Sequence, residues 1–409
     1  MNNNDAEEQP TDLIIIGAGA AGLSLLLALK ELNYPHTVKV LEQQNGPQHD
    51  RIWSFWNSED LPFYMKAIIS HEWSSWSLST EQRQYTMSDS FYPYCSIRSE
   101  HLGALAIEHA EQETNVEIIF NCDVLSIECN ADKVFITTAN GTMLAKKVVD
   151  TRPPPLHHEH NGLFQCFYGE EISINADILE PFTVKLMDQL RYSELGIEFV
   201  YVLPFSSNHA LVEFTCFSIT VIDKETLKAR LTERLKHMFE QHDYKVLRTE
   251  QAALPMYSIN HNNLNKTHKN LIYGGIAGGA MRVATGFSFL NSQRWAKQCA
   301  QALIEQGKLA PSPPINVIYR TMDALMIRVL RNDMKIGVTI FEQMFKKVKA
   351  KRFARFMTEQ ATTTDVISVI AAMPKRAFLR AAYSALTAAF TTFLFKRTKS
   401  LNKHNGRQQ

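Results

Sequence analysis

The sequence predicts a mixed α/β fold in three parts: a nucleotide-binding domain, an antiparallel sheet and a helical C-terminal region. Three observations predict it. Residues 12–42 run from an apolar strand through a glycine-rich turn into a helix-period segment, short alternating runs fill residues 153–269, and helical spacing continues over 322–395. With 409 residues, 45% of them apolar, the chain is long enough for about two or three domains.

Residues 12–42 have the pattern of a Rossmann-like βαβ unit. An apolar strand leads into Gly17-x-Gly19-x-x-Gly22. Gly17 predicts a tight turn, and Gly19 predicts close approach of a pyrophosphate to the backbone and the helix N-terminus. Gly22 predicts close packing of the helix. Glu42 ends a second strand 20 residues after Gly22, where a carboxylate binds ribose hydroxyls. We therefore expect a dinucleotide site, and the N-terminal position of the unit favours FAD over a free nicotinamide nucleotide.

An aromatic segment follows over residues 51–94, and it holds four of the five tryptophans. Such rings are ordinary core residues, but their faces also attract cations. We expect some of them to face an apolar ligand or a cation. The pocket candidates are Trp53, Phe55 and Trp56, joined later in the chain by Phe287.

Two further runs, at residues 134–138 and 146–149, predict strands of the first domain, with Asn140-Gly141 as a hairpin turn between them. Arg152 and the three prolines after it interrupt any regular element. We therefore place the first domain boundary after residue 152.

The middle of the chain, residues 153–269, predicts an antiparallel sheet that binds the substrate. Runs at 164–169, 199–203 and 210–217 predict strands, and the last two form a hairpin. Leucines at helical spacing then predict a helix from about residue 224 to 241.

The chain returns to nucleotide-like sequence in a second glycine cluster, after a short strand at residues 270–273. The cluster and the turn after it contain Gly274, Gly275, Gly278, Gly279, Thr285 and Gly286. Because amides without a Cβ allow close approach of phosphates and rings, we expect these residues to complete the same site. Residues 11–152 and 270–316 would then form one composite FAD-binding domain.

Charge is sorted along the chain. Residues 316–409 hold 18 Lys and Arg against 5 Asp and Glu, although the net charge of the whole chain is only +1. A basic region of this kind binds nucleic acid, an anionic membrane or the acidic remainder of the chain. No nucleic-acid module accompanies it, so we expect no nucleic-acid partner.

The helical region, residues 317–395, has no run of the roughly 18 uncharged apolar residues that span a bilayer. It therefore predicts either helices that dock on a membrane surface or helices that pack on the protein. Residues 1–10 and 396–409 are expected to be disordered or flexible tails.

The six cysteines have neither the pairing nor the spacing of a metal site or a disulfide framework, so no metal is expected. The acidic N-terminus lacks the apolar run of a signal peptide. A cytoplasmic location is therefore expected. Nothing in the sequence indicates an oligomeric state.

Glu213 is the carboxylate that we expect to carry the chemistry. It lies in the middle of a predicted strand, where alternation places it on one face with Leu211 and Thr215, and Val212 and Phe214 on the other. If that face covers a dry pocket, desolvation raises the pKa of Glu213 and keeps a proton available for general acid catalysis. If the face is wet, Glu213 has no such role.

Taken in order, the motifs of this chain resemble those of the flavin-dependent lycopene cyclases. The likeness covers about residues 12–380 and rests on Gly17-x-Gly19-x-x-Gly22 with Glu42, Trp53-Ser-Phe55, Phe164-Gln-x-Phe167, Phe199-Val-Tyr-x-Leu-Pro204, Glu213-x-Thr215, Ala253-Leu-Pro-Met256 and Thr285-Gly-Phe-Ser288. The chain departs from the family pattern at Phe214, where an acid often follows the catalytic Glu, and at Phe287, where Tyr is commoner.

The resemblance implies an isomerase without net redox change. In that family a carboxylic acid, whose place falls on Glu213, protonates the end of lycopene or a related linear carotene, and a β-ionone ring results. Reduced FAD, maintained by NAD(P)H, stabilises the carbocation. Because carotenes dissolve in bilayers, we expect peripheral membrane association through the basic C-terminal helices.

Two other functions remain open. An FAD-dependent monooxygenase or isoprenoid reductase shares the predicted fold, but such enzymes carry Gly-Asp where this chain has Gly274-Gly275. A flavin-containing lipid-binding protein without catalysis would leave Glu213 inert.

Overall fold

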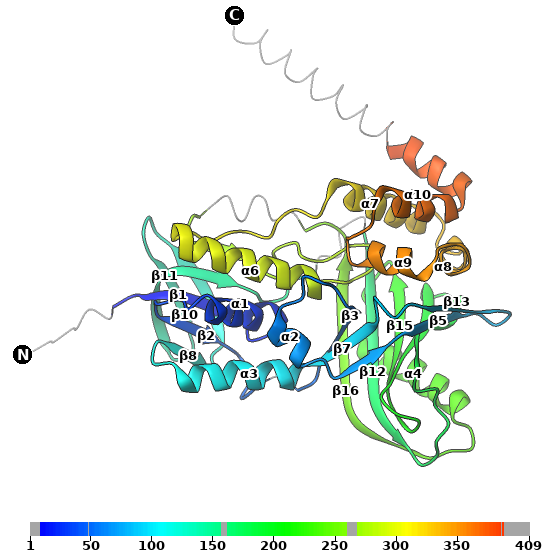
Figure 1. The fold of residues 1–409 in the computed structure, drawn as a ribbon, viewed down its shortest axis with the longest axis horizontal. Helices are drawn as coiled ribbons and strands as arrows, with labels where there is room; N and C mark the ends of the chain where they lie inside the picture. Colours follow the sequence, from blue (N-terminus) through cyan, green and yellow to red (C-terminus); the bar gives the residue numbers. More distant parts are fainter. Residues whose placement is uncertain (1–8, 48, 157–161, 260–267, 386, 388–409) are drawn as a thin grey trace, which may run out of the picture.

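The computed structural model describes residues 9–47, 49–156, 162–259, 268–385 and 387. Within these residues the strands form two seven-stranded sheets and one three-stranded sheet, arranged along the long axis of the molecule (Figure 1). Most of the two expected tails, and the apolar stretch beyond residue 387, lie outside the described residues.

The first sheet contains the predicted βαβ unit. Its order is β8-β2-β1-β11-β10-β9, and β17 also pairs with β11. The strands are β1 (Thr11–Ile16), β2 (Val38–Leu41), β8 (Val116–Ile119), β9 (Val124–Cys129), β10 (Val134–Thr138), β11 (Gly141–Asp150) and β17 (Leu271–Tyr273). Strands β1, β2 and β8 are parallel, whereas β10 and β11 form the hairpin predicted at Asn140-Gly141.

Strand β1 is apolar throughout because both faces of the sheet are covered there. Leu13 and Ile15 pack with α1 (Ala20–Glu31) and α6 (Phe289–Gln306), while Ile14 and Ile16 belong to a separate cluster on the other face. Helix α3 (Ser99–Gln112) also packs against α1.

The second sheet is mainly antiparallel, in the order β16-β12-β15-β14-β13-β5-β6. Its strands are β5 (Ser75–Ser79), β6 (Gln84–Ser88), β12 (Leu163–Ile174), β13 (Thr183–Tyr192), β14 (Ile197–Pro204), β15 (His209–Ser218) and β16 (Tyr244–Met256). Strands β14 and β15 form the predicted hairpin. Strands β5 and β6 come from the range expected for the first domain, yet β5 pairs with β13, so the domain boundaries along the chain stay a prediction.

The two faces of the second sheet meet different elements. Helix α4 (Lys224–Met238), which begins at the Asp223 cap and ends three residues before the predicted limit, covers one face. Val212 and Phe214 of β15 pack toward it, as the alternation predicted.

A small sheet of β3 (Ile52–Trp56), β7 (Tyr94–Arg98) and β4 (His71–Trp73) lies between the two large sheets (Figure 1). The short helix α2 (Phe63–Ala67) follows β3 in the chain. The aromatic segment predicted from the sequence thus occupies the junction of the molecule.

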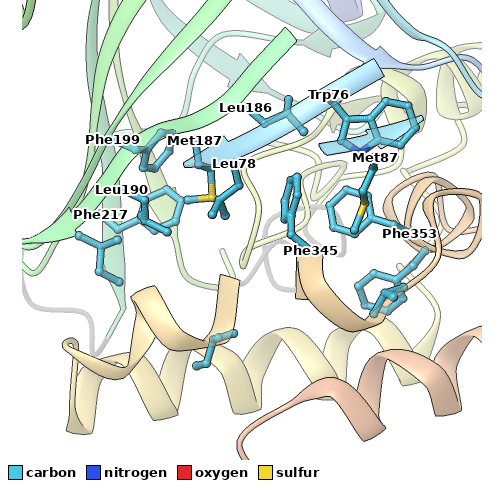
Figure 2. Close-up of a cluster of buried hydrophobic side chains, with 14 of the residues drawn as sticks. Trp76, Leu78, Met87, Leu186, Met187, Leu190, Phe199, Phe217, Phe345 and Phe353 are labelled. Carbon is cyan, nitrogen blue, oxygen red and sulfur yellow. The ribbon is translucent and has the colours of Figure 1, made fainter. Parts of the chain in front are cut away.

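In the described part of the C-terminal region, helices α7 (Val317–Asn332), α8 (Ile336–Lys347), α9 (Ala350–Met357) and α10 (Thr363–Ala372) cover the other face of the second sheet (Figure 1). Figure 2 shows Phe345 and Phe353 from these helices in one apolar cluster with strand residues such as Leu186. The basic helical region therefore packs on the protein. Among the described residues no helix is both long and apolar enough to cross a bilayer.

Candidate active site

A cavity of about 1060 Å³ lies between the second sheet and the C-terminal helices. The sheet contributes Phe199, Thr215 and Phe217, and the helices contribute Met322 and Phe345. Most of the remaining lining is also aromatic or aliphatic. Such a cavity suits a large hydrocarbon, because neither the wall nor the ligand has to give up many hydrogen bonds to water.

Glu213 lies on the wall of this cavity, at the centre of β15. It is 9% exposed, and it shares its face with Thr215, as predicted. Burial, and next the negative charge of Glu250, raise the pKa of Glu213 well above its ordinary value. Burial thus favours the protonated form of Glu213, which is the form that a general acid needs.

Glu250 of β16 is the group that sequence reasoning missed. It lines the same cavity, is 5% exposed, and its carboxyl group interacts directly with that of Glu213. Burial also raises the pKa of Glu250, although its bond with Glu213 opposes that rise. The nearest sequence signal was the motif Ala253-Leu-Pro-Met256, from which Glu250 is separated by two residues.

Two phenol groups lie on the other side of Glu213. Tyr201 of β14 is directly opposite Glu213 in the ladder, and its hydroxyl lies 3.0 Å from the hydroxyl of Tyr94 in β7. Both phenols line the cavity, and burial raises the pKa of each above 10. They are therefore neutral hydrogen-bonding groups beside the acid.

Two guanidinium groups lie near the carboxyl pair. The charges of Arg51 and Arg248 act on both Glu213 and Glu250 and oppose the rise in their pKa values. Arg248 donates its Nε hydrogen to Glu171, which also accepts from Arg98. This anchoring fixes Arg248 at the edge of the site.

The first glycine motif lies where β1 meets α1, and its residues fit a dinucleotide. Gly17 has φ of +96°, and a Cβ on Gly22 would overlap the carbonyl oxygen of Gly17. Helix α1 has Gly19 as its N-cap, no side chain that caps it and no acid in its first turn. Its N-terminal N–H groups thus have no capping side chain, which fits the pyrophosphate site that stays a prediction.

Glu42 directly follows β2, beside this turn, and is buried. Its Oε2 accepts from the Ala18 N–H at 2.8 Å and its Oε1 accepts from the Gln44 N–H at 3.0 Å. The carboxylate therefore holds the glycine turn in place, and each oxygen keeps a second lone pair for a ribose hydroxyl.

The second glycine cluster lies against the first. A Cβ on Gly275 would be 2.8 Å from the Cβ of Ala21 in α1, and a Cβ on Gly274 would overlap the ring of Trp295 in α6. Gly278 and Gly279 continue the same turn. Segments about 250 residues apart in sequence thus form one surface, which fits the composite FAD site that the sequence predicted.

The cavity reaches this second segment. Ile276, Thr285 and Gly286 line it together with Glu213, and a Cβ on Gly286 would overlap the side chain of Gln165. A flavin held by the two glycine segments would therefore adjoin the space in front of the carboxyl pair.

The four aromatic candidates separate into two groups. Trp53, Trp56 and Phe287 line the cavity, and Trp56 lies 5.5 Å from Phe287 between ring centroids. Phe55 does not line it, because Phe55 is 2% exposed within the cluster that packs on α1 and α6, and it stacks on Phe289, 4.7 Å between centroids. Alternation places Trp53 on the same face of β3, where it also stacks on Phe289 at 5.9 Å, but only Trp53 reaches the cavity.

Arg282, 1% exposed, fixes the helices over the cavity. It donates from Nη2 to Asp323 of α7 at 2.6 Å and from Nη1 to the Phe356 carbonyl of α9 at 3.2 Å. Its guanidinium also lies over the rings of Tyr319 and Phe356, at 4.8 and 5.1 Å. One side chain therefore ties two of the covering helices to the loop that follows β17.

Comparison with known proteins gives a family match over most of the chain. The family model described as lycopene cyclase protein matches residues 12–383. A lycopene β-cyclase of Pseudescherichia vulneris is 25% identical over 229 residues, 54% of this chain and 56% of that protein. A lycopene β-cyclase of Pantoea ananas is 23% identical over 284 residues, 68% of this chain and 70% of that protein. The matched part is thus little more than half the length of the first relative.

Solved structures share the fold at lower identity. A geranylgeranyl bacteriochlorophyll reductase-like protein from Thermoplasma acidophilum has a TM-score of 0.59 at 13% identity, over 91% of this chain and 98% of that one. The flavin-dependent brominase Bmp2 has a TM-score of 0.56 at 15% identity, over 86% and 94% of the two chains. These likenesses confirm the predicted fold class, a Rossmann-like domain joined to an antiparallel sheet.

Proposed function

The chain belongs to the lycopene cyclase family, and on this premise we propose that it cyclises the linear ends of lycopene, or of a related carotene, to β-ionone rings. The reaction has no net redox change and serves carotenoid biosynthesis. The observation that carries the proposal is a buried carboxyl group of raised pKa, Glu213, on the wall of a large apolar cavity.

Substrate binding rests on the shape and dryness of the cavity. A linear carotene offers no polar group for recognition, so its affinity comes from apolar area removed from water. The sheet and the C-terminal helices supply that area, and a bound carotene would displace water from the space in front of Glu213. Without water, a carbocation formed there lives long enough to cyclise.

The proton of Glu213 starts the reaction. It adds to the terminal double bond, the cation that results is attacked by the neighbouring double bond, and loss of one proton leaves the ring. The ring faces of Trp56 and Phe287 line the same space and stabilise positive charge there.

The residues that would hold FAD are Gly17, Gly19, Gly22 and Glu42 at the nucleotide end, and Gly274, Gly275, Gly278, Gly279, Thr285 and Gly286 at the flavin end. When bound and reduced by NAD(P)H, the flavin supplies an electron-rich ring that stabilises the carbocation electrostatically.

The C-terminal helices also form the border of the cavity at which we expect the substrate to enter. Exposed apolar side chains gather where α7, α10 and the segment after α10 border the cavity, namely Val317, Ile318, Ile367, Ile370 and Leu379. Lys375, Arg376 and Arg380 lie in the same segment as Leu379. We infer peripheral docking of this border on the anionic, cytoplasmic face of a membrane, from which the carotene enters.

Expression in lycopene-producing cells tests the function. The wild-type protein is expected to convert lycopene to cyclic products, and Glu213→Gln is expected to lower conversion at least about a hundredfold, because general acid catalysis contributes that much. Unchanged lycopene with folded, flavin-loaded wild-type protein would reject the proposal. Full conversion by Glu213→Gln would reject only the assignment of the acid.

A further inference from the structure

Gly169 of β12 creates a gap between the two carboxyl groups. In the sheet order β16-β12-β15, Gly169 is opposite both Glu213 of β15 and Glu250 of β16. These two strands are separated by β12, about 10 Å apart at the usual strand spacing. A Cβ on Gly169 would lie 2.6 Å from Cγ and 3.2 Å from Oε1 of Glu213. The side chain of Glu213 therefore extends over the glycine toward Glu250.

The carboxyl pair needs a proton. Oε2 of Glu250 accepts from the Ile52 N–H at 3.2 Å, whereas its buried Oε1 has no N–H or O–H donor in the described part of the chain. A carboxylate donates nothing, so contact between two carboxyl groups is a hydrogen bond only when one of them is protonated. Two ionised groups at this depth would repel each other.

The surroundings differ between the two groups. Glu250 receives the backbone N–H, which favours its ionised form. Glu213 faces the cavity and the neutral phenols of Tyr94 and Tyr201. The charges of Arg51 and Arg248 reach both groups and allow the pair a single negative charge.

We propose that Glu213 and Glu250 share one proton over the gap at Gly169, with the proton on Glu213 and the negative charge on Glu250. This proposal rests on the function proposed above. Glu250 is then a positioning residue that keeps Glu213 protonated and oriented toward the cavity. When Glu213 gives its proton to the carotene, two negative charges remain in the dry pair. The pair regains one proton when the ring cation loses one, so the isomerisation needs no other reactant.

Infrared titration of the flavin-loaded protein tests the pair without any turnover. The band of the protonated carboxyl is assigned to Glu213 by its loss in Glu213→Gln. We expect this band in the wild type to persist at neutral pH. In Glu250→Gln the negative neighbour is gone and the amide donates to an ionised Glu213. The titration midpoint should then fall by at least about one pH unit, a change of about 1.4 kcal/mol.

Glu170→Gln is the matched control. Glu170 neighbours Gly169 on β12, is buried, and has a pKa raised by burial, but it lies on the other face and bonds to Tyr168. This variant should leave the Glu213 band and its midpoint unchanged. Equal midpoints in the wild type and Glu250→Gln would overturn the proposal.

The pH dependence of cyclisation gives the second readout. The alkaline limb of kcat/KM should move to lower pH in Glu250→Gln, with a rate about tenfold lower near neutral pH and recovery on acidification. A purely structural role would lower the rate equally at every pH, and that result would also overturn the proposal. A wild type that shows the shared proton but cyclises nothing would reject the function and leave the pair standing.

If Glu250→Gln does not fold, Gly169→Ala tests the same carboxyl pair. It keeps both carboxyl groups but pushes Glu213 off the gap, and the midpoint should fall in the same direction. An unchanged midpoint in folded Gly169→Ala would contradict the role of the gap.

Discussion

At the scale of single residues, the site depends on where Glu213 and its neighbours point. Strand alternation in the sequence predicted the face of Glu213 correctly, because residues 210–217 form one unbroken strand. Glu250 and Gly169 could not be found in this way. Their contact depends on the register of β12 with β15 and β16, which long-range packing sets and no local pattern records.

The raised pKa of Glu213 predicts a pH-dependent stability. A group whose pKa is higher in the folded state stabilises the fold most below its unfolded value near 4.5, and this stability is lost as pH rises toward the folded pKa. Glu213→Gln buries no ionisable group at this position. Its melting temperature should therefore exceed that of the wild type increasingly at alkaline pH, as calorimetry at several pH values would measure.

The control for this stability experiment is a carboxyl group that is exposed to solvent. Glu117→Gln removes a half-exposed group on β8 and should shift melting by the same small amount at every pH. If the difference in melting temperature between Glu213→Gln and the wild type does not grow with pH, the result would contradict a buried, protonated carboxyl group at Glu213.

At the scale of elements, the second sheet shows what local patterns leave out. The sequence predicted the strands near residues 164, 199 and 210, and their hairpin, from alternation and turn residues. The positions of β5 and β6 in that sheet were not predicted, because β5, which carries β6, pairs with β13 about 100 residues away. The covering helices were predicted as helices, but their position over the cavity rests on long-range contacts, among them those of the buried Arg282 with Asp323 of α7 and the Phe356 carbonyl of α9.

The ion pair of Arg282 with Asp323 predicts a large effect at the covering helices. Asp323→Asn leaves Arg282 buried without a balancing charge, so the free energy of unfolding should fall by about 3–5 kcal/mol. Denaturant unfolding followed by tryptophan fluorescence would measure the loss. A change below about 1 kcal/mol, the level of an exposed pair, would show that the guanidinium is hydrated instead.

The glycine motif predicts loss of cofactor when α1 is displaced. Gly22→Ala places a methyl group on the Gly17 carbonyl, so α1 must shift and its N-terminal amides move. We expect the purified variant to carry at least tenfold less flavin per protein, roughly a loss of 1.4 kcal/mol in binding. Flavin absorbance relative to protein would measure it.

Gly307→Ala is the control for general destabilisation. It strains a residue with φ of +63° at the end of α6, where a new Cβ meets no other atom within 4 Å. This variant should keep its flavin. Equal flavin content in both variants and the wild type would contradict the placement of the pyrophosphate at α1.

At the scale of the whole molecule, one cavity connects three regions that are far apart in sequence. The loop after β17, with Ile276 and Gly286, lines one part of it, the carboxyl pair lies on the sheet wall, and the exposed apolar border lies between α7 and α10. This arrangement gives a reason for the basic C-terminal region, which the sequence left between two interpretations. The helices pack on the protein, and their outer border is the part that we expect to meet lipid.

Membrane docking predicts that charged substitutions at the cavity border weaken binding of the protein to vesicles. Ile370→Glu with Leu379→Glu puts charges on side chains that are 53% and 69% exposed at the cavity border. Removing two apolar anchors of about 1.5 kcal/mol or more each should lower binding to phosphatidylglycerol vesicles more than tenfold in flotation. Leu125→Glu, on an exposed side chain of β9 in the first sheet, should bind as the wild type does. Equal binding by the border variant would reject this docking surface.

The most direct test of the central claim is the mass and ring content of the product made from lycopene. Purified protein, loaded with reduced FAD without oxygen, would receive lycopene in vesicles, and the extract would be separated by chromatography with mass detection. We expect cyclic carotenes of unchanged mass from the wild type and Glu170→Gln, and unreacted lycopene from Glu213→Gln. Unreacted lycopene from the folded, flavin-loaded wild type, or a product whose mass shows added oxygen or hydrogen, would contradict the account.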